Sequence, residues 1–260
     1  MQSLLNSLPL MLLTLPAVLI SLSVHEASHG YVAYKLGDPT ARNLGRLTLN
    51  PLKHINLFGF IAMLFFRIGW ANPVPINARN FKNPKRGMAL SAAAGPLSNL
   101  CLAAIFTVLL RLVLIPIESI VDSSFESITL YNPYWMEEVY EILHANTAYT
   151  VLSLLALMLY LGIILNINLM VFNLIPLPPL DGSRMAYVLL PTDTYFKIMQ
   201  YEQYIMIAFI VIFATGVLNT PLSYINNGIT TFFFKALDMP ETHLYFSISD
   251  LMSRLPQFTL

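Results

Sequence analysis

The chain has 260 residues, of which 56% are hydrophobic and only 11% are charged. This composition excludes a water-soluble surface and predicts a polytopic membrane protein. The 14 basic and 14 acidic residues cancel to a net charge of zero, which argues against nucleic acid as a partner.

The first predicted element is a membrane-spanning helix from about Pro9 to Leu36. A glycine and a proline follow it and end the helix. Its second half contains His25-Glu26-Ala27-Ser28-His29, the HExxH pattern. Two histidines four residues apart lie on one helix face and can bind one Zn²⁺, while Glu26 can take a proton from water at the metal. Because ionisable groups are costly to bury in an apolar span, the pattern indicates a functional site.

A more polar region follows the first span. Thr40 to Ile55 alternates weakly between leucines and polar residues, which predicts a short strand or hairpin near the membrane surface. Asn56 to Trp70 is apolar but short and interrupted, so we expect a re-entrant or interfacial segment. Two prolines make Asn72 to Asn77 an extended turn. His54 is either a residue that supports the site or contacts substrate, or a histidine that only satisfies hydrogen bonds within the fold.

The second span is expected from about Gly87 to Ile115. Small residues from Ala92 to Gly95 indicate close helix packing, and we interpret Asn99 in the same way. Cys101 is the only cysteine, so it is expected to be a packing residue and no intrachain disulfide can form. Arg111 is expected to extend its charge toward the membrane surface.

A third span is expected from about Thr147 to Ile175 and a fourth from Tyr204 to Leu218, and Ile225 to Leu237 can dip back into the membrane. Asn166 and Asn168, within the third span, are expected to hydrogen-bond between helices. The predicted fold is therefore an all-α polytopic membrane protein. It has about four transmembrane helices and a re-entrant or hairpin segment after the first helix.

Charge is distributed unevenly along the chain. Residues 35–86 contain nine basic residues and one acid, whereas residues 116–146 contain six acids and no Lys or Arg. Since basic residues accumulate in cytoplasmic loops, we place the first stretch inside and the acidic loop outside. The site then faces the cytoplasm in a multi-pass protein of the cell membrane. The lack of a targeting segment or added domain indicates a prokaryotic plasma membrane.

A catalytic zinc site needs a third protein ligand. Lys35 occupies the position at which one zinc-protease pattern has a further histidine. Asp181 is an acid on the same side of the membrane, and it follows three prolines in four positions. These prolines must end the third helix, and unwound backbone at membrane depth indicates a hydrated pocket. Asp181 would complete a two-His, one-Asp site, and Gly182 lets the chain turn there.

The two motifs together resemble the site-2 protease family of intramembrane zinc metalloproteases. The resemblance rests on HEASH and on the Asn, Pro-rich, Leu-Asp-Gly signature from Asn173 to Gly182, and it covers about Leu15 to Leu190. Gly95-Pro96-Leu97-Ser98-Asn99 also resembles the G-x-x-x-N element that the family has between these motifs. The resemblance implies zinc as the cofactor, with Glu26 as the general base. The implied zinc ligands are His25, His29 and Asp181.

Two further expectations come from the family alone. Asn173 would lie near the metal and contact the scissile carbonyl, although a residue that ends the third span fits its position as well. Gly69 to Asn77 would form a loop that touches substrate. The family carries PDZ or CBS modules in many members, and this chain shows neither. We interpret residues 1–260 as one integral membrane metalloprotease domain, with a core at 8–190 and a fourth span and tail at 191–260.

The predicted function is hydrolysis of peptide bonds in or near transmembrane segments of other membrane proteins, as in regulated intramembrane proteolysis. The lipid bilayer and a transmembrane protein substrate are the expected partners. A membrane transporter or sensor that binds zinc without hydrolysis is the alternative, and zinc flux would distinguish it. A catalytically inactive scaffold is a third interpretation, disfavoured by intact HExxH and Leu-Asp-Gly motifs.

Overall fold

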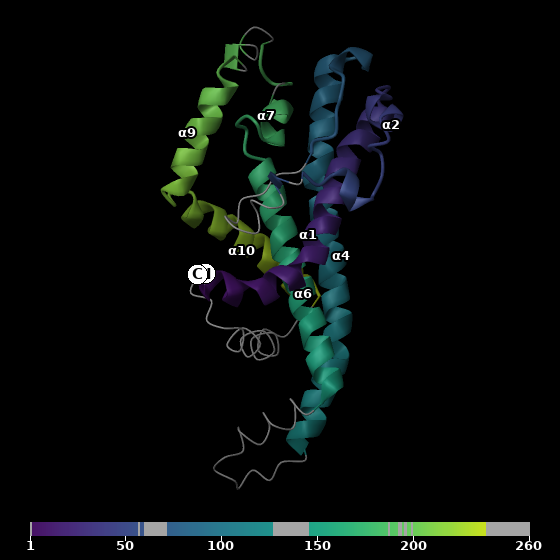
Figure 1. Ribbon diagram of the computed structural model, residues 1–260, viewed down its shortest axis with the longest axis vertical. Helices are drawn as coiled ribbons and strands as arrows, with labels where there is room; N and C mark the ends of the chain where they lie inside the picture. Colours follow the sequence, from purple (N-terminus) through teal and green to yellow (C-terminus); the bar gives the residue numbers. More distant parts are fainter. Residues whose placement is uncertain are drawn as a thin grey trace. The chain divides into compact units, whose positions relative to one another are not determined.

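The computed structural model describes residues 2–56, 58–59, 72–126, 146–186, 188–191, 194, 197–198 and 200–237. Within these ranges every regular element is a helix and no strand occurs, which confirms the predicted all-α class. Figure 1 shows the helices in chain order, from α1 to α10.

In the described part of the chain, three helices are long and apolar enough to cross a membrane. At about 1.5 Å per residue, even the shortest of their apolar stretches, with 25 residues, exceeds a hydrocarbon core of roughly 30 Å. Their positions agree with the first three predicted spans. The second extends past its predicted end, so the predicted outer loop starts later than Pro116, and residues 127–145 lie outside the described part. The three helices are α1 (Gln2–Lys35), α4 (Pro84–Glu126) and α6 (Thr147–Asn173).

The predicted fourth span corresponds to a shorter helix. Helix α9 (Glu202–Ala214) has 13 residues and would reach only about 20 Å, less than the thickness of a bilayer core. The fourth crossing therefore stays a prediction. Helix α10 (Asn219–Ala236) contains most of the segment that was expected to dip back, and none of its residues is buried.

The prediction of a strand or hairpin from Thr40 to Ile55 is wrong. The described chain forms helix α2 (Thr40–Asn43), a loop and the short 3-10 helix η1 (Pro51–Lys53). Two local features explain the difference. The Asp38 carboxylate accepts a hydrogen bond from the Thr40 amide, which starts a helical turn, and Gly45 has φ 64°, which breaks an extended chain.

The following segment agrees with the sequence where it is described. Residues 72–77 form neither helix nor strand and lead into the short helix η2 (Ala78–Asn80). The predicted re-entrant segment from Asn56 to Trp70 falls mainly on residues outside the described part. Residues at its start contact Asn72, which lies just after its end. The Asn56 side-chain amide donates to Asn72 Oδ1 at 2.9 Å, and the Asn72 backbone amide donates to the His54 carbonyl at 2.7 Å.

Asp38 joins the end of α1 to two later segments. Its buried carboxylate accepts hydrogen bonds from the Thr40 amide and hydroxyl, from the Asn77 amide at 2.7 Å and from the Asn80 side-chain amide at 2.6 Å. Burial alone would raise the pKa of the Asp38 carboxyl, but these hydrogen bonds outweigh it and lower the pKa below its ordinary value. The charged form therefore stabilises the fold.

Asp38→Asn is expected to lower the free energy of unfolding by about 1–3 kcal/mol at neutral pH, because an amide group would then face the Asn77 N–H. A lowered carboxyl pKa means that this stabilisation is complete above the unfolded value of about 3.9 and is lost as pH falls through the folded value. Thermal unfolding in detergent, at pH 7 and below pH 4, measures the difference between native and variant. An unchanged unfolding midpoint at pH 7, or a difference that grows in acid, would contradict the assignment.

Polar side chains of α6 connect it to other helices, as predicted. Asn166 Nδ2 donates to Ser21 Oγ of α1 at 2.8 Å, and Asn226 of α10 donates to the side chain of Asn168. Arg111, which was expected to extend toward the membrane surface, pairs with Glu118 two turns further along α4 at 3.1 Å. Cys101 is exposed on α4, so the prediction that it packs inside is wrong.

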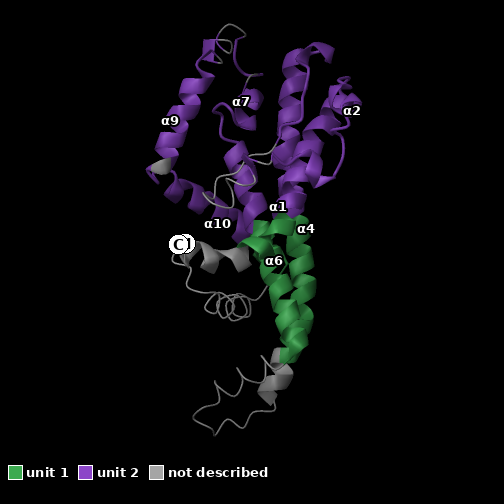
Figure 2. Cartoon of the chain, in the orientation of Figure 1, with its two compact units in different colours: residues 1–17, 104–163, 232–260 green, residues 18–103, 164–231 purple. Residues whose placement is uncertain are grey.

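The chain divides into two compact units, which Figure 2 colours separately. Unit 1 comprises residues 1–17, 104–163 and 232–260, and the side chains of Leu110, Leu114 and Leu157 are fully buried in it. Unit 2 comprises residues 18–103 and 164–231. Every residue that the sequence predicts for the site belongs to unit 2.

Candidate metal centre

His25 and His29 project from one face of α1. They lie one helical turn apart, both side chains are buried, and their Nε2 atoms are 3.0 Å from each other. The ring planes are nearly perpendicular, at 88°. The i, i+4 spacing therefore brings two imidazole nitrogens to one point inside unit 2, as the sequence predicts.

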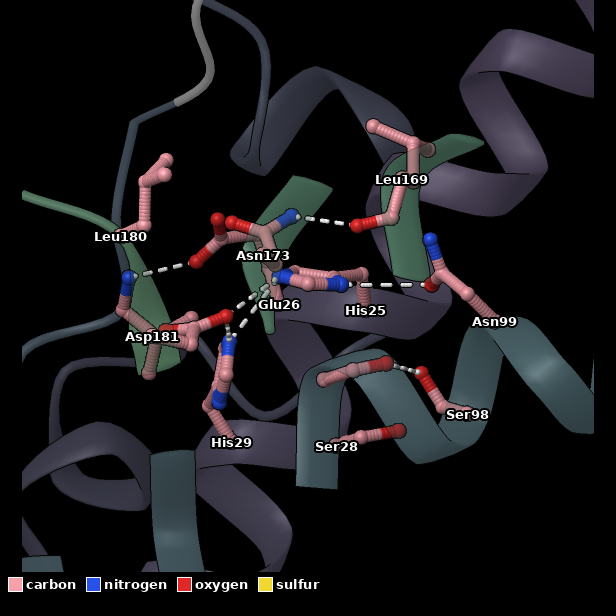
Figure 3. A network of polar contacts seen from close by, with 12 residues as sticks. His25, Glu26, Ser28, His29, Ser98, Asn99, Leu169, Asn173, Leu180 and Asp181 are labelled. Atoms are coloured by element: carbon pink, nitrogen blue, oxygen red, sulfur yellow. Dashed lines mark hydrogen bonds and ion pairs between the residues drawn. The ribbon is translucent and has the colours of Figure 1, made fainter. Parts of the chain in front are cut away.

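Asp181 reaches the same point from a distant part of the chain. Helix α6 ends at Asn173, turns follow over residues 174–180, and helix α7 (Asp181–Ala186) begins with the aspartate. The prolines thus end α6 as predicted, since a proline cannot donate its amide to the preceding turn. Asp181 Oδ2 lies 3.2 Å from Nε2 of both His25 and His29, and the three side chains point toward one another in Figure 3.

Gly182 is needed for a reason that differs from the prediction. It is not among the described glycines with positive φ, so the chain does not require its conformational freedom. A Cβ atom at this position would instead collide with the backbone carbonyls of Leu174 and Ile175. The missing side chain lets the start of α7 approach the turn after α6, and this approach places Asp181.

Hydrogen bonds fix which nitrogen of each ring carries a proton. His25 Nδ1 lies 3.2 Å from Asn99 Oδ1, and His29 Nδ1 lies 2.7 Å from the Ser91 carbonyl oxygen. Because both oxygens are acceptors, each Nδ1 is the protonated nitrogen in a neutral ring. The Nε2 atoms then present lone pairs to each other and to the Asp181 carboxylate.

Three electron-rich atoms at this spacing fit a bound cation. They are separated by 3.0, 3.2 and 3.2 Å, while ligand atoms of a tetrahedral zinc site with bonds of about 2.0 Å are roughly 3.3 Å apart. Asp181 Oδ2 is buried and has no hydrogen-bond partner in the described structure, despite the two nearby nitrogens. The donor set of two imidazoles and a carboxylate is one that zinc accepts.

The charge of Asp181 agrees with this interpretation. Burial alone would raise the pKa of the Asp181 carboxyl, but proton-bearing His25 and His29 rings lower it well below its ordinary value, and a cation bound at the same point would act in the same direction. The group is therefore an anion at neutral pH. Among the described residues, His25, His29 and Asp181 are the one group of His, Cys, Asp and Glu side chains that could hold a metal ion.

Glu26 lies beside the two histidines and contacts the 72–77 segment. Its Oε2 accepts a hydrogen bond from the Val74 amide at 2.8 Å. The segment packs closely against α1, since a Cβ atom on Gly30 would be 3.0 Å from the Val74 side chain. The carboxylate is thus held by Oε2, and Oε1 makes no hydrogen bond to the described residues.

Two further polar candidates, His54 and Asn173, make contacts of their own. His54 is buried, its Nε2 lies 2.8 Å from the Thr48 carbonyl oxygen, and its Nδ1 has no hydrogen-bond partner among the described residues, so both interpretations of His54 stay predictions. Asn173 donates from Nδ2 to the Leu169 carbonyl at 2.9 Å, a contact within the last turns of α6. This bond fits the interpretation of Asn173 as a residue that ends the span, and its predicted role near the metal stays a prediction.

Sequence reasoning missed the part that α4 plays in the site. Ser91, Gly95 and Asn99 lie four residues apart on one ridge of α4, and the ridge packs on the two imidazoles. A Cβ atom on Gly95 would be 2.6 Å from Cε1 of His25 and would also collide with the His29 ring. The small residues do indicate close packing, as predicted, but what they pack against is the candidate ligand pair.

Known proteins resemble this chain over most of its length. The family model described as Peptidase family M50 matches residues 13–214. The chain is 39% identical over 211 residues to "Putative zinc metalloprotease YwhC" of Bacillus subtilis, covering 81% of this chain and 83% of the relative. It is 26% identical over 207 residues to "Putative zinc metalloprotease Rip2" of Mycobacterium tuberculosis, covering 77% and 66%. No solved structure gives a significant match.

Proposed function

The chain belongs to peptidase family M50 and is a membrane zinc metalloprotease, and we propose that His25, His29 and Asp181 bind its zinc while Glu26 acts as the general base. The observation that carries this proposal is the convergence of three ligand atoms within 3.2 Å. They come from two segments that are about 150 residues apart in the sequence. The adjacent glutamate supplies the group that HExxH sites use for proton transfer.

Bound zinc would supply a Lewis acid that polarises the scissile carbonyl and makes water in the site more acidic. Glu26 would take a proton from that water through Oε1, because Oε2 already accepts the Val74 amide. The water oxygen forms the new bond to the carbonyl carbon, and the C–N bond breaks. Glu26 then returns the proton to the leaving amine nitrogen, which restores the base.

The substrate we propose is a membrane-spanning segment of another protein. Two of the three candidate ligands, His25 and His29, lie on α1, a helix that can itself cross the bilayer, so a peptide bond must come to the metal at or near the membrane. A helix hides its carbonyl groups in hydrogen bonds, and a segment that unwinds easily should therefore be cleaved preferentially. Such cleavage would suit regulated intramembrane proteolysis. We include Asn173 as a group that contacts the scissile carbonyl.

We propose that the site faces the cytoplasm of a cell membrane and that residues 1–260 act as one catalytic domain with its core at 8–190. The excess of basic residues between positions 35 and 86 supports this orientation. In a Cys101→Ser background, a cysteine introduced by Lys82→Cys should react with an impermeant maleimide only after the membrane is opened. Labelling of intact cells would show that this region faces the outside and would contradict the proposed orientation.

Cleavage of a substrate should depend on bound zinc and should not require transport of zinc across the membrane. The purified chain, reconstituted in liposomes with a single-span substrate, is expected to cleave it, to stop after chelation and to recover when zinc is added back. A zinc-sensitive dye inside the same liposomes tests for the transporter. Zinc influx without any cleavage of several single-span substrates would overturn the protease and favour the transporter.

A further inference from the structure

Asn99 is buried completely and contacts one of the candidate zinc ligands. Its Oδ1 lies 3.2 Å from His25 Nδ1, on the side of the ring opposite to Asp181 and His29. In Figure 3 the amide of Asn99 and the carboxylate of Asp181 lie at the two ends of the His25 ring. The contact joins α4 to α1 across 74 residues of sequence.

The orientation of this amide decides where the His25 proton resides. With Oδ1 toward the ring, Nδ1 must carry the proton, and the Nε2 lone pair is available for a metal. With the amide turned over, Nδ2 would donate to Nδ1, and the proton would move to Nε2. His25 could then no longer bind a metal through the atom that faces Asp181.

We propose that Asn99 is a positioning residue that fixes His25 in the tautomer and ring orientation required for zinc binding. This inference rests on the proposed function, because it concerns a ligand of the same zinc. An outer partner that accepts from the far nitrogen of a ligand histidine both orients the ring and makes it a better donor. Asn99 has that geometry.

The two histidines are held by different kinds of group. His29 Nδ1 contacts the Ser91 backbone carbonyl, which no side-chain substitution removes. His25 depends instead on the side chain of Asn99. Loss of the Asn99 amide should therefore release one ligand and leave the other in place.

The nitrogen of the Asn99 side-chain amide does not explain why an asparagine occupies this position. Nδ2 is buried and has no hydrogen-bond partner in the described structure. Among the described residues, the contact of Asn99 Oδ1 with His25 is thus the one hydrogen bond that the Asn99 side chain makes. Asn99→Asp would thus lose no hydrogen bond, and its charged carboxylate would be an acceptor only.

The test measures zinc affinity of the full chain in detergent by competition with a chromophoric chelator. Asn99→Leu, similar in size but without an acceptor, is expected to bind zinc about 10–100 times more weakly. Asn99→Asp should bind within a few-fold of the native chain or more tightly. Ser98→Ala is the matched control, because the Ser98 hydroxyl donates to the Gly95 carbonyl of its own helix, and the zinc affinity of this variant should be unchanged.

A Co²⁺-substituted sample gives a readout that a general loss of stability would not produce. The visible ligand-field spectrum should change in Asn99→Leu and be restored in Asn99→Asp. Native affinity in Asn99→Leu, or a tenfold or larger loss in Asn99→Asp, would overturn the proposal. If Asn99→Leu does not fold, Asn99→Asp decides by itself. A native chain that binds no zinc would instead refute the proposed function.

Discussion

Replacing Glu26 with glutamine is expected to abolish cleavage while the protein keeps its zinc. The amide cannot take a proton from water, and general-base catalysis contributes roughly 10²–10⁴-fold to rate. The substitution should leave the local structure intact, because the glutamine oxygen can still accept the Val74 amide that Glu26 Oε2 accepts. Loss of activity would then report on proton transfer and not on folding.

Two measurements on the same preparation test this result. Cleavage of a co-reconstituted single-span substrate gives the rate, and atomic emission gives the zinc content per chain. Glu118→Gln is a matched control, since it makes the same chemical change on α4 where the carboxylate pairs with Arg111. Undiminished cleavage in Glu26→Gln would remove Glu26 as the base, and the control should cleave as the native chain does.

Replacing Asp181 with asparagine is expected to remove both zinc and cleavage. Asp181 is the only carboxylate in the three-residue group, and its Oδ2 lies 3.2 Å from both histidine nitrogens. Loss of a direct ligand should weaken zinc binding by more than the roughly 10–100-fold that loss of an outer partner produces. The change removes one charge and keeps the size of the side chain, so the start of α7 should be preserved.

The pair of variants separates the two roles. Glu26→Gln should retain zinc without cleaving, whereas Asp181→Asn should lose both. Arg184→Ala is the control for the second variant, because Arg184 is an exposed residue of the same short helix. Stoichiometric zinc in Asp181→Asn, measured after dialysis against a weak chelator, would assign the third ligand to another residue.

Much of the architecture could be predicted because it depends on neighbours in the chain. The three long helices follow from runs of apolar residues, and the end of α6 follows from prolines that cannot donate to the previous turn. The histidine pair follows from helical periodicity alone. Local sequence misled us at Cys101, which is exposed on α4, and at Thr40 to Ile55. In the second case a hydrogen bond from Thr40 to Asp38 and the positive φ of Gly45 oppose a strand that the leucine pattern favours.

The sequence by itself determined the spans of α1, α4 and α6, the face that His25 and His29 share, and the point where the backbone unwinds before Asp181. Only the tertiary structure decided what these groups contact. It placed the ridge of Ser91, Gly95 and Asn99 on the imidazoles and the Val74 amide on Glu26. The reason is physical: periodicity and proline chemistry act within a few residues, whereas a contact between two helices depends on how their surfaces fit, and spacing along the chain does not encode it.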